Sequence, residues 1–276
     1  MGLTRTDGPL SSYAPATVNY AIDGPPHKLL MHPFPRRVRA EVAGRTVLDT
    51  RRGYLVHESN LLPVLYVPED DVDTSVLVPS DHTTHCPFKG DATYRSLRVG
   101  DTVRENAVWT YPEPVAAAPW LHGLVALYWN AADAWYDEDE QVFAHLTDPY
   151  TRVDVRPTHR HVVVTHVAPD GLRTVLAESH APFVLSETGL RNRWYLPAGD
   201  VTVELAPSET RTRCPYKGEA AYRDALLPPA TTLADAFWVY PDPLPESARI
   251  AGLLSVTDGP RDDGSEIRVT VDGEPA

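Results

Sequence analysis

Both cysteines of the chain and two of its three lysines lie in one short motif that occurs twice. Residues 86–90 and 214–218 both read Cys-Pro-aromatic-Lys-Gly. Proline and glycine shape a turn that would hold the ammonium near the sulfur and favour the thiolate, which is a nucleophile. Basic charge elsewhere is almost all arginine, so these two places call for a compact, deprotonatable ammonium. We predict catalytic roles for Cys86, Lys89, Cys214 and Lys217.

Each copy also places a glutamate at the end of an apolar, strand-like stretch. Glu58 follows residues 54–57, and Glu187 follows residues 183–186. A partly desolvated carboxylate at such a place could act as a general base, or it could pair with the lysine. Both glutamates are therefore predicted to be catalytic.

Aromatic residues recur at matching places in the two copies. They could supply an aromatic wall and phenol donors, which together with the groups above describe a small-molecule pocket. The predicted ligand-binding residues of this kind are Tyr94, Trp109, Tyr111, Tyr222, Trp238 and Tyr240.

A structural interpretation of the same residues stays open. A free cysteine is commonly a small buried hydrophobe, and the motif could simply shape the entry to a strand. The lysine and the glutamate could form a structural bridge, and the aromatic rings could fill the core.

A zinc site is a further idea, since His82, His85 and Cys86 are all possible ligands. The second copy has Thr210 and Arg213 where the first has the two histidines, so the set is not repeated. Adjacent residues on a strand also point to opposite faces. We therefore predict neither a metal nor a cofactor.

His161 lies near the junction of the two copies. An imidazole titrates near neutral pH, so His161 could shuttle protons at a bound ligand near the interface. Surface or interdomain packing is the alternative role for this side chain.

The repeat extends far beyond the motif. Tyr66 to Val72 matches Tyr195 to Val201, a shift of 129 positions. That period is too long for a solenoid unit and indicates a duplicated domain, which we expect to form a pseudo-dimer about a twofold axis within one chain. The predicted parts are an irregular arm (1–30), a first repeat domain (31–135), a joining segment (136–160), a second repeat domain (161–258) and a polar C-terminal tail (259–276).

The local patterns predict strands and turns. Residues 38–49 and 161–171 both look like hairpins with a glycine at the turn, and 27 prolines interrupt the chain too often for long helices. Short helical turns are expected near residues 71–78 and 243–250. The predicted fold is mainly β, with two similar small domains that are curled-sheet or barrel-like and related by internal duplication.

Composition excludes several classes of protein. No apolar run reaches membrane-spanning length, the first residues lack a secretory signal pattern, and two cysteines make no disulfide framework. A net charge of −13 without a dense basic cluster disfavours nucleic acid as a partner. We expect a cytoplasmic protein whose partner is a small-molecule ligand.

The tandem Cys-Pro-aromatic-Lys-Gly motifs, the Trp-x-Tyr-Pro-x-Pro motifs (109–114 and 238–243) and the joining segment resemble the bacterial domain-of-unknown-function family 427. The resemblance covers about residues 36–257. It implies a small β-rich fold, often in tandem, and the family sometimes carries a nucleotidyltransferase label. The chain has neither a phosphate-binding glycine loop nor aspartates spaced for two magnesium ions.

Three functional hypotheses follow. The first is a small-molecule enzyme with a Glu/Cys/Lys/Tyr pocket in each repeat, acting on a polar metabolite by covalent or acid–base chemistry. The second is a ligand-binding protein without catalysis, and the third is a nucleotidyltransferase. If one copy is more active, Arg211 and Arg213 beside Cys214 favour the second, because their charges would stabilise a thiolate.

Overall fold

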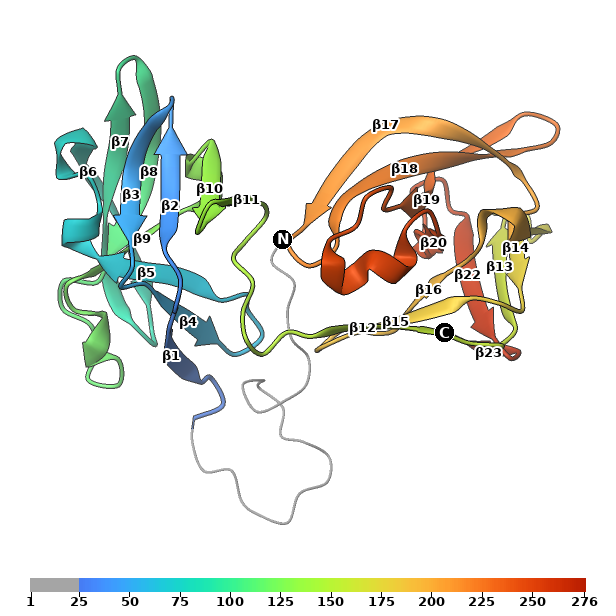
Figure 1. Cartoon of the computed structure of the whole chain (residues 1–276), viewed down its shortest axis with the longest axis horizontal. Coiled ribbons are helices and arrows are strands. Elements are labelled where there is room, and N and C mark those ends of the chain that lie inside the picture. The colour runs from blue at the N-terminus through green and yellow to red at the C-terminus, as the bar shows by residue number, and fades with distance from the viewer. Residues whose placement is uncertain (1–24) are drawn as a thin grey trace, which may run out of the picture. The chain divides into compact units, whose positions relative to one another are not determined.

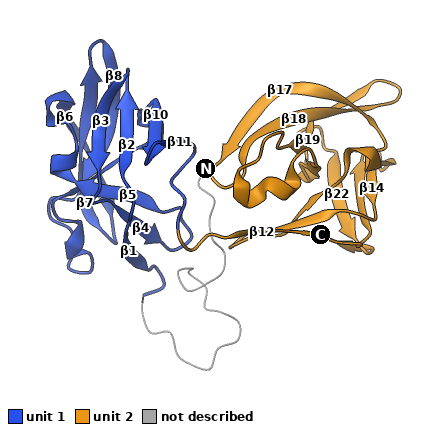
Figure 2. Cartoon of the chain, viewed as in Figure 1, with its two compact units in different colours: residues 1–148 blue, residues 149–276 orange. Residues whose placement is uncertain are grey.

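The computed structural model describes residues 25–276, which divide into two compact units (Figure 2). Unit 1 ends at Asp148 and unit 2 runs from Pro149 to Ala276. Most of the arm predicted for residues 1–30 lies outside the described residues, and its last two residues, Leu29 and Leu30, belong to a strand instead. Within residues 25–276, no helix is both long and apolar enough to span a membrane.

Unit 1 contains two sheets, and within each of them neighbouring strands pair antiparallel (Figure 1). The seven-stranded sheet has the order β1 (Leu29–Pro33), β4 (Tyr54–Glu58), β5 (Val64–Pro68), β9 (Leu124–Leu127), β8 (Thr102–Thr110), β7 (Gly90–Val99) and β6 (Leu77–Cys86). The four-stranded sheet has the order β11 (Glu140–Val142), β10 (Ala134–Asp137), β2 (Val38–Val42) and β3 (Arg45–Thr50). Short 3-10 helices lie between strands of this unit: η1 (Glu69–Asp71), η2 (Thr74–Val76), η3 (Pro119–Leu121) and η4 (Trp129–Ala131).

Unit 2 repeats this plan in three sheets (Figure 1). The first is β12 (Val153–Pro157), β15 (Phe183–Glu187) and β16 (Arg193–Tyr195). The second is β14 (Arg173–Ser179), β13 (Val162–Val167), β22 (Glu266–Val271) and β21 (Gly259–Pro260), with β23 (Glu274–Pro275) also on β22. The third is β17 (Glu204–Cys214), β18 (Gly218–Leu227), β19 (Thr231–Val239) and β20 (Leu254–Val256). Its 3-10 helices are η5 (Ala198–Asp200) and η6 (Pro245–Ile250).

The sheets confirm the prediction of a mainly β protein with a duplicated domain. The seven-stranded sheet of unit 1 corresponds to two separate sheets in unit 2, which meet at a single bridge between Leu196 and Leu254. None of the sheets formed by the described residues closes on itself, so open sheets replace the barrel-like alternative.

The predicted hairpins form as β2–β3 and β13–β14. The expected helical turns form as η1, η2 and η6. The C-terminal segment differs from the polar tail predicted for residues 259–276, because β22 pairs with β13 along its whole length. Ile267 and Val271 are buried, so the apolar alternation of this segment reflects a strand of the core rather than a polar end.

Each unit has two hydrophobic cores. The larger core of unit 1 includes Val38, Leu48 and Val108, and that of unit 2 includes Val162, Ala177 and Phe237. A smaller core in each unit is rich in aromatic rings. The predicted site residues gather around these two smaller aromatic cores, with the exception of His161.

Candidate functional site

The Cys-Pro-aromatic-Lys-Gly motif of unit 1 is the tight turn of the β6–β7 hairpin. Cys86 and Gly90 pair across the hairpin, and the amide of Lys89 donates to the carbonyl of Cys86 at 3.2 Å. Gly90 has a φ of +110°, and a β-carbon there would lie 3.0 Å from the carbonyl oxygen of Glu113. The turn therefore needs glycine both for its backbone conformation and for its close approach to the neighbouring chain.

The turn also meets the second repeated motif. The amide of Val115, just beyond the Trp-x-Tyr-Pro-x-Pro segment, donates to the carbonyl of Lys89 at 3.1 Å. In unit 2, Leu244 donates to Lys217 in the same way at 3.2 Å. Gly218 repeats the positive φ at +95°, and a β-carbon added there would lie 3.3 Å from the carbonyl oxygen of residue 242. The two motifs are thus parts of one local structure, built once in each unit.

Glu58 and Lys89 form a buried ion pair in unit 1. Glu58 ends β4, and the Lys89 ammonium donates to its Oε1. Their side chains are only 8% and 10% exposed. The ammonium also lies 5.7 Å from the ring centre of Tyr111, within range of a cation–π contact. The other carboxylate oxygen, Oε2, lies 3.2 Å from Nε2 of His27.

The pair recurs in unit 2. Glu187 ends β15, and the Lys217 ammonium donates to its Oε2 at 2.5 Å. These side chains are 8% and 12% exposed. The sequence left two roles open for each lysine and glutamate, a catalytic pair and a structural bridge. Each lysine does contact its glutamate, and this contact is compatible with both roles.

The thiols lie beside buried tyrosines. Cys86 and Cys214 are half-buried free cysteines. Burial raises the pKa of Tyr111 well above its ordinary value, and the nearby Cys86 and Glu58 raise it further. Burial likewise raises the pKa of Tyr240, with further contributions from Tyr195 and Cys214. Both phenols therefore keep their protons at neutral pH and can act as hydrogen-bond donors.

The remaining predicted aromatic residues line the same cores. Trp109 donates its indole N–H to the hydroxyl of Tyr66 at 3.1 Å, and Trp238 donates to Tyr195 at 3.4 Å. The hydroxyl of Tyr94 lies 2.9 Å from Oγ1 of Thr84, and the corresponding hydroxyl–threonine contact in unit 2 joins residues 222 and 212 at 3.2 Å.

The sequence patterns did not assign Tyr66, Tyr195 or His27 to the site. The two tyrosines begin the repeated Tyr-x-Pro segment, so their repetition in both copies could have indicated a place in the site. His27 had no such signal, because the corresponding residue of unit 2 is Thr151 and because His27 reaches Glu58 through the pairing of β1 with β4.

In unit 2, η6 contacts the motif turn. Ser247 of η6 donates its hydroxyl to the carbonyl of Tyr216 at 3.1 Å, and Arg249 donates to the carbonyl of Val155 in β12 at 3.3 Å. Arg211 donates to backbone carbonyls, and Arg213 pairs with Glu219 at 2.8 Å. The arginines flanking Cys214 thus have contacts of their own.

The two histidines that were considered as zinc ligands have other contacts. Nδ1 of His85 lies 2.6 Å from Oδ1 of Asp91, and the His82 ring packs against Tyr94 with ring centres 4.6 Å apart. Within residues 25–276, the His/Cys/Asp/Glu group that could hold a metal ion is a different one, formed by His161, Glu178 and His180.

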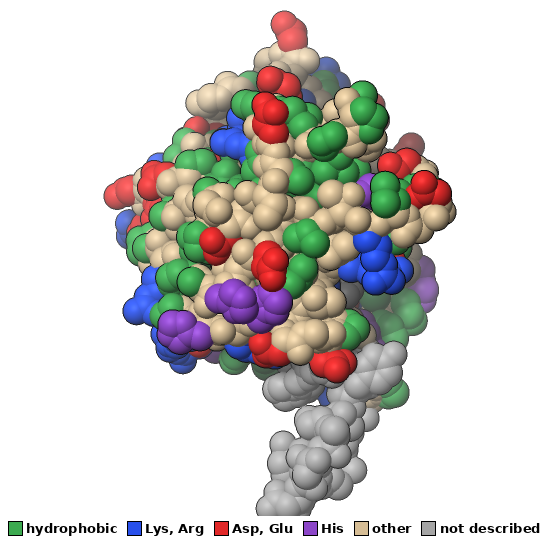
Figure 3. All heavy atoms as spheres, turned by 90° about the vertical axis from the view of Figure 1, so that its right-hand side faces the viewer, with side chains coloured by type: hydrophobic (Ala, Val, Ile, Leu, Met, Phe, Trp, Pro, Cys, Tyr) green, Lys and Arg blue, Asp and Glu red, His purple; other side chains and the backbone are tan. Residues whose placement is uncertain are grey.

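His161 lies on a different sheet of unit 2 from the Lys217–Glu187 pair. It precedes β13, and its Nε2 lies 2.7 Å from Oε1 of Glu178. Figure 3 shows histidine and acidic side chains near one another on the face of the molecule turned toward the viewer. The structure therefore separates His161 from the other predicted site residues, and the proton-shuttle role stays a prediction.

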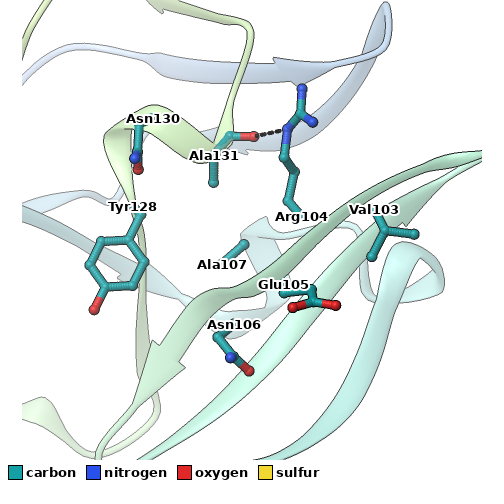
Figure 4. A pocket seen from close by; sticks show the side chains of 8 residues that line it. All are labelled: Val103, Arg104, Glu105, Asn106, Ala107, Tyr128, Asn130 and Ala131. Carbon is teal, nitrogen blue, oxygen red and sulfur yellow. Dashed lines mark hydrogen bonds between the residues drawn. The ribbon is translucent and has the colours of Figure 1, made fainter.

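A surface hollow of about 420 Å³ lies beside the aromatic core of unit 1 (Figure 4). Tyr128 borders it and also packs against Trp109, with ring centres 4.5 Å apart. Burial, with a hydrogen bond to Tyr94, raises the pKa of Tyr128 to about 12. The residues that line the hollow are Val103, Arg104, Glu105, Asn106, Ala107, Tyr128, Asn130 and Ala131, and none of them is a predicted catalytic residue.

Comparison with known proteins identifies the family. The family model described as a domain of unknown function (DUF427) matches twice, over residues 30–138 and 154–272. The chain therefore belongs to this family and carries two copies of its domain, which confirms the resemblance inferred from the motifs. No curated protein matches the chain.

Proposed function

We propose that each copy of the domain is a small-molecule enzyme whose lysine–glutamate pair performs acid–base chemistry on a polar metabolite. One observation carries the proposal: in both units a buried Lys–Glu pair lies beside a half-buried thiol and a protonated buried phenol. Titratable groups that converge with altered environments are typical of active sites.

The proposed chemistry follows from the protonation states. The Glu58 carboxylate would take a proton from the substrate while the Lys89 ammonium gives one back, which leaves a neutral acid and a neutral amine. Tyr111 would donate a hydrogen bond to an oxygen of the substrate, because its raised pKa keeps it protonated. Cys86 would either contact the substrate or, after losing its proton to solvent, add as a thiolate to an electrophilic C=O carbon, with the π pair moving to the oxygen that Tyr111 hydrogen-bonds.

The pair must exchange protons with solvent after each turnover. In unit 1, His27 lies 3.2 Å from Glu58 and is 20% exposed, so it offers a path for that exchange. Both cysteines are free thiols, which fits the cytoplasmic location we propose.

The test combines a reactivity measurement with a search for turnover. The alkylation rate of Cys86 and Cys214 by iodoacetamide would be followed against pH by peptide mass spectrometry. A pool of polar metabolites would be incubated with the chain in D₂O and searched for a change of mass, because acid–base chemistry at carbon exchanges protons with solvent. We expect a compound that changes with the wild-type chain and not with Glu58→Gln/Glu187→Gln. If no compound changes and both thiols react only on unfolding, the proposal fails.

Ligand binding without catalysis is the second candidate. The observation that favours it is the pairing itself, since Lys89 and Glu58 neutralise each other and each already has a hydrogen-bond partner. A metabolite that raises the midpoint of thermal unfolding and leaves the incubation unchanged would favour this candidate. The nucleotidyltransferase alternative has no comparable support. Pyrophosphate release from a nucleoside triphosphate with a divalent metal would be needed to revive it.

A further inference from the structure

Three side chains on the outer face of the β13–β14 hairpin come together in unit 2. Glu178 lies near the end of β14 and His180 follows that strand, so the two residues project from the same face. Val162 pairs with Ser179, which places His161 across the ladder from His180. Residues opposite each other on antiparallel strands are close neighbours. The backbone thus brings two imidazoles and one carboxylate to one spot.

Their geometry is close to that of a metal site. Nε2 of His161 lies 2.7 Å from Oε1 of Glu178, and the rings of His161 and His180 stack with centres 4.3 Å apart. One donor atom from each of the three residues lies within 4.8 Å of the other two. Ligands of a tetrahedral zinc ion, bound at about 2.0–2.2 Å, lie about 3.4 Å from one another. Small rotations of exposed side chains would close that gap.

Hydrogen bonds to Asp272 hold the backbone that carries His161. The amide of His161 donates to Oδ1 of Asp272 at 2.9 Å, and Arg160 donates to Oδ2 of the same carboxylate at 2.6 Å. The amide of Asp272 donates in turn to the carbonyl of His161 at 2.8 Å. The main chain that carries His161 is therefore fixed, and rotation of the side chains suffices to form the site.

Unit 1 offers an internal comparison at the same place. The registers of β2–β3 and β13–β14 put Arg37, Asp49 and Arg51 where unit 2 has the two histidines and the glutamate. Arg37 forms an ordinary ion pair with Asp49, with Nε 2.7 Å from Oδ1. A guanidinium cannot be a metal ligand because it keeps its protons. Unit 2 retains the carboxylate and has a metal-ligating side chain in place of each arginine.

We propose that His161, Glu178 and His180 bind one divalent transition-metal ion, with zinc as the first choice. Imidazole nitrogen and carboxylate oxygen are ligands that zinc accepts, and three protein ligands leave a fourth position for water or an anion. The net charge of −13 further attracts a cation. This site lies on a different sheet from the lysine–glutamate pair of unit 2 and does not depend on the proposed acid–base chemistry.

The test is a zinc titration of the full chain by isothermal titration calorimetry. The main variant, His161→Arg/His180→Arg, gives unit 2 the arginines of unit 1. His122→Arg, at an exposed histidine in unit 1, is the control for replacing a histidine by arginine away from the site, and Glu178→Gln removes the carboxylate alone. Circular dichroism would check that each variant is folded.

We expect about one zinc per chain for the wild type and for His122→Arg, and at least about tenfold weaker binding for the double variant and Glu178→Gln. Cobalt should give visible absorption bands that the double variant loses. Equal zinc affinity in all four proteins would overturn the proposal, because it would assign the binding to dispersed histidines. A wild type that binds no zinc at about 100 µM would overturn it as well.

Discussion

Unit 1 and unit 2 hold the same lysine–glutamate pair among different neighbours. In unit 1, His27 reaches Glu58, and its ring stacks on Phe88 at 3.9 Å. The strand registers put Thr151 at the position of His27, and Tyr216 stands in place of Phe88. Phe88 is 41% exposed whereas Tyr216 is 9% exposed. The pair and its turn are thus the shared framework, and the side chains that cover them are where the two units differ.

The tryptophans show the same contrast. Trp109 is 9% exposed and packs against Tyr128, whereas Trp238 is half-buried and its ring centre lies 5.5 Å from the guanidinium of Arg193. Arg193 also pairs with Asp258 at 2.6 Å. If both units bind small molecules, we expect unit 2 to accept the more anionic one, because a cation borders its aromatic wall.

The largest effect is expected from breaking the buried pair. Lys89→Met and Lys217→Met each leave a buried carboxylate without its ammonium, which should lower the free energy of unfolding by about 3–5 kcal/mol. Lys217→Met should cost more, since Glu58 in unit 1 keeps its contact with Nε2 of His27 at 3.2 Å. Urea unfolding followed by circular dichroism measures both.

The control replaces the whole pair. Glu58→Gln/Lys89→Met and Glu187→Gln/Lys217→Met remove both charges, so each double variant should be more stable than its lysine single variant. If the single and double variants have the same free energy of unfolding, the ion pair contributes little to stability. The turn would then be the only structural feature that stabilises both units in the same way.

The glycine of each turn should come next. Gly90→Ala and Gly218→Ala both place a β-carbon at a positive φ, which we expect to cost about 1–3 kcal/mol. Gly90→Ala should cost more, because its β-carbon would lie 3.0 Å from a carbonyl oxygen, against 3.3 Å for Gly218. Thermal unfolding of the two variants gives the order. The reverse order would mean that the backbone near Glu113 shifts away from the added β-carbon more easily than the backbone near Asp242 does.

Low pH should lower the stability of unit 2 through His166, a residue without a titratable counterpart in unit 1. This side chain is 5% exposed in β13, where the register puts Val42 of unit 1. Burial lowers the pKa of His166; nearby Asp263 opposes that shift and Arg261 adds to it. The unfolded chain therefore takes up a proton at a higher pH than the folded chain does. Stability should fall as the pH drops below about 6.5, by up to about 1.4 kcal/mol for each pH unit.

The matched variant is His166→Val, which copies unit 1. It should remove this part of the pH dependence while leaving stability above neutral pH little changed. Urea unfolding between about pH 5 and pH 8, the range in which histidine titrates, makes the comparison. An unchanged slope in the variant would assign the acid sensitivity to other groups.

The sequence predicted what depends on local pattern. The turn conformation at Gly90, the strands ending in Glu58 and Glu187, and the duplication all follow from turn residues, apolar stretches and repeat spacing. It did not predict the contact of His27 with Glu58 or the order of the seven-stranded sheet. Both depend on pairing between segments far apart in the chain, and no local preference encodes such pairing. The strand at residues 266–271 was missed although its residues alternate between buried and more exposed positions. The convergence of His161, Glu178 and His180 was missed for another reason: the hairpin that carries them was predicted, but the register of its two strands, which decides which side chains meet, was not.

The smallest effect should come from the cation over Trp238. Arg193→Ala removes a contact in which the guanidinium is 38% exposed, so we expect a loss of only about 0.5 kcal/mol. Asp258 keeps a partner in that variant, since Arg191 donates to both of its oxygens, at 2.5 and 2.7 Å. Tyr128→Ala in unit 1 should cost more, because it strips packing from Trp109 and the hydrogen bond with Tyr94. Thermal unfolding with tryptophan fluorescence would report both. If Arg193→Ala lowers the stability more than Tyr128→Ala does, Arg193 has a structural role in unit 2. The different surroundings of Trp109 and Trp238 would then reflect stability and would not indicate which ligand each unit accepts.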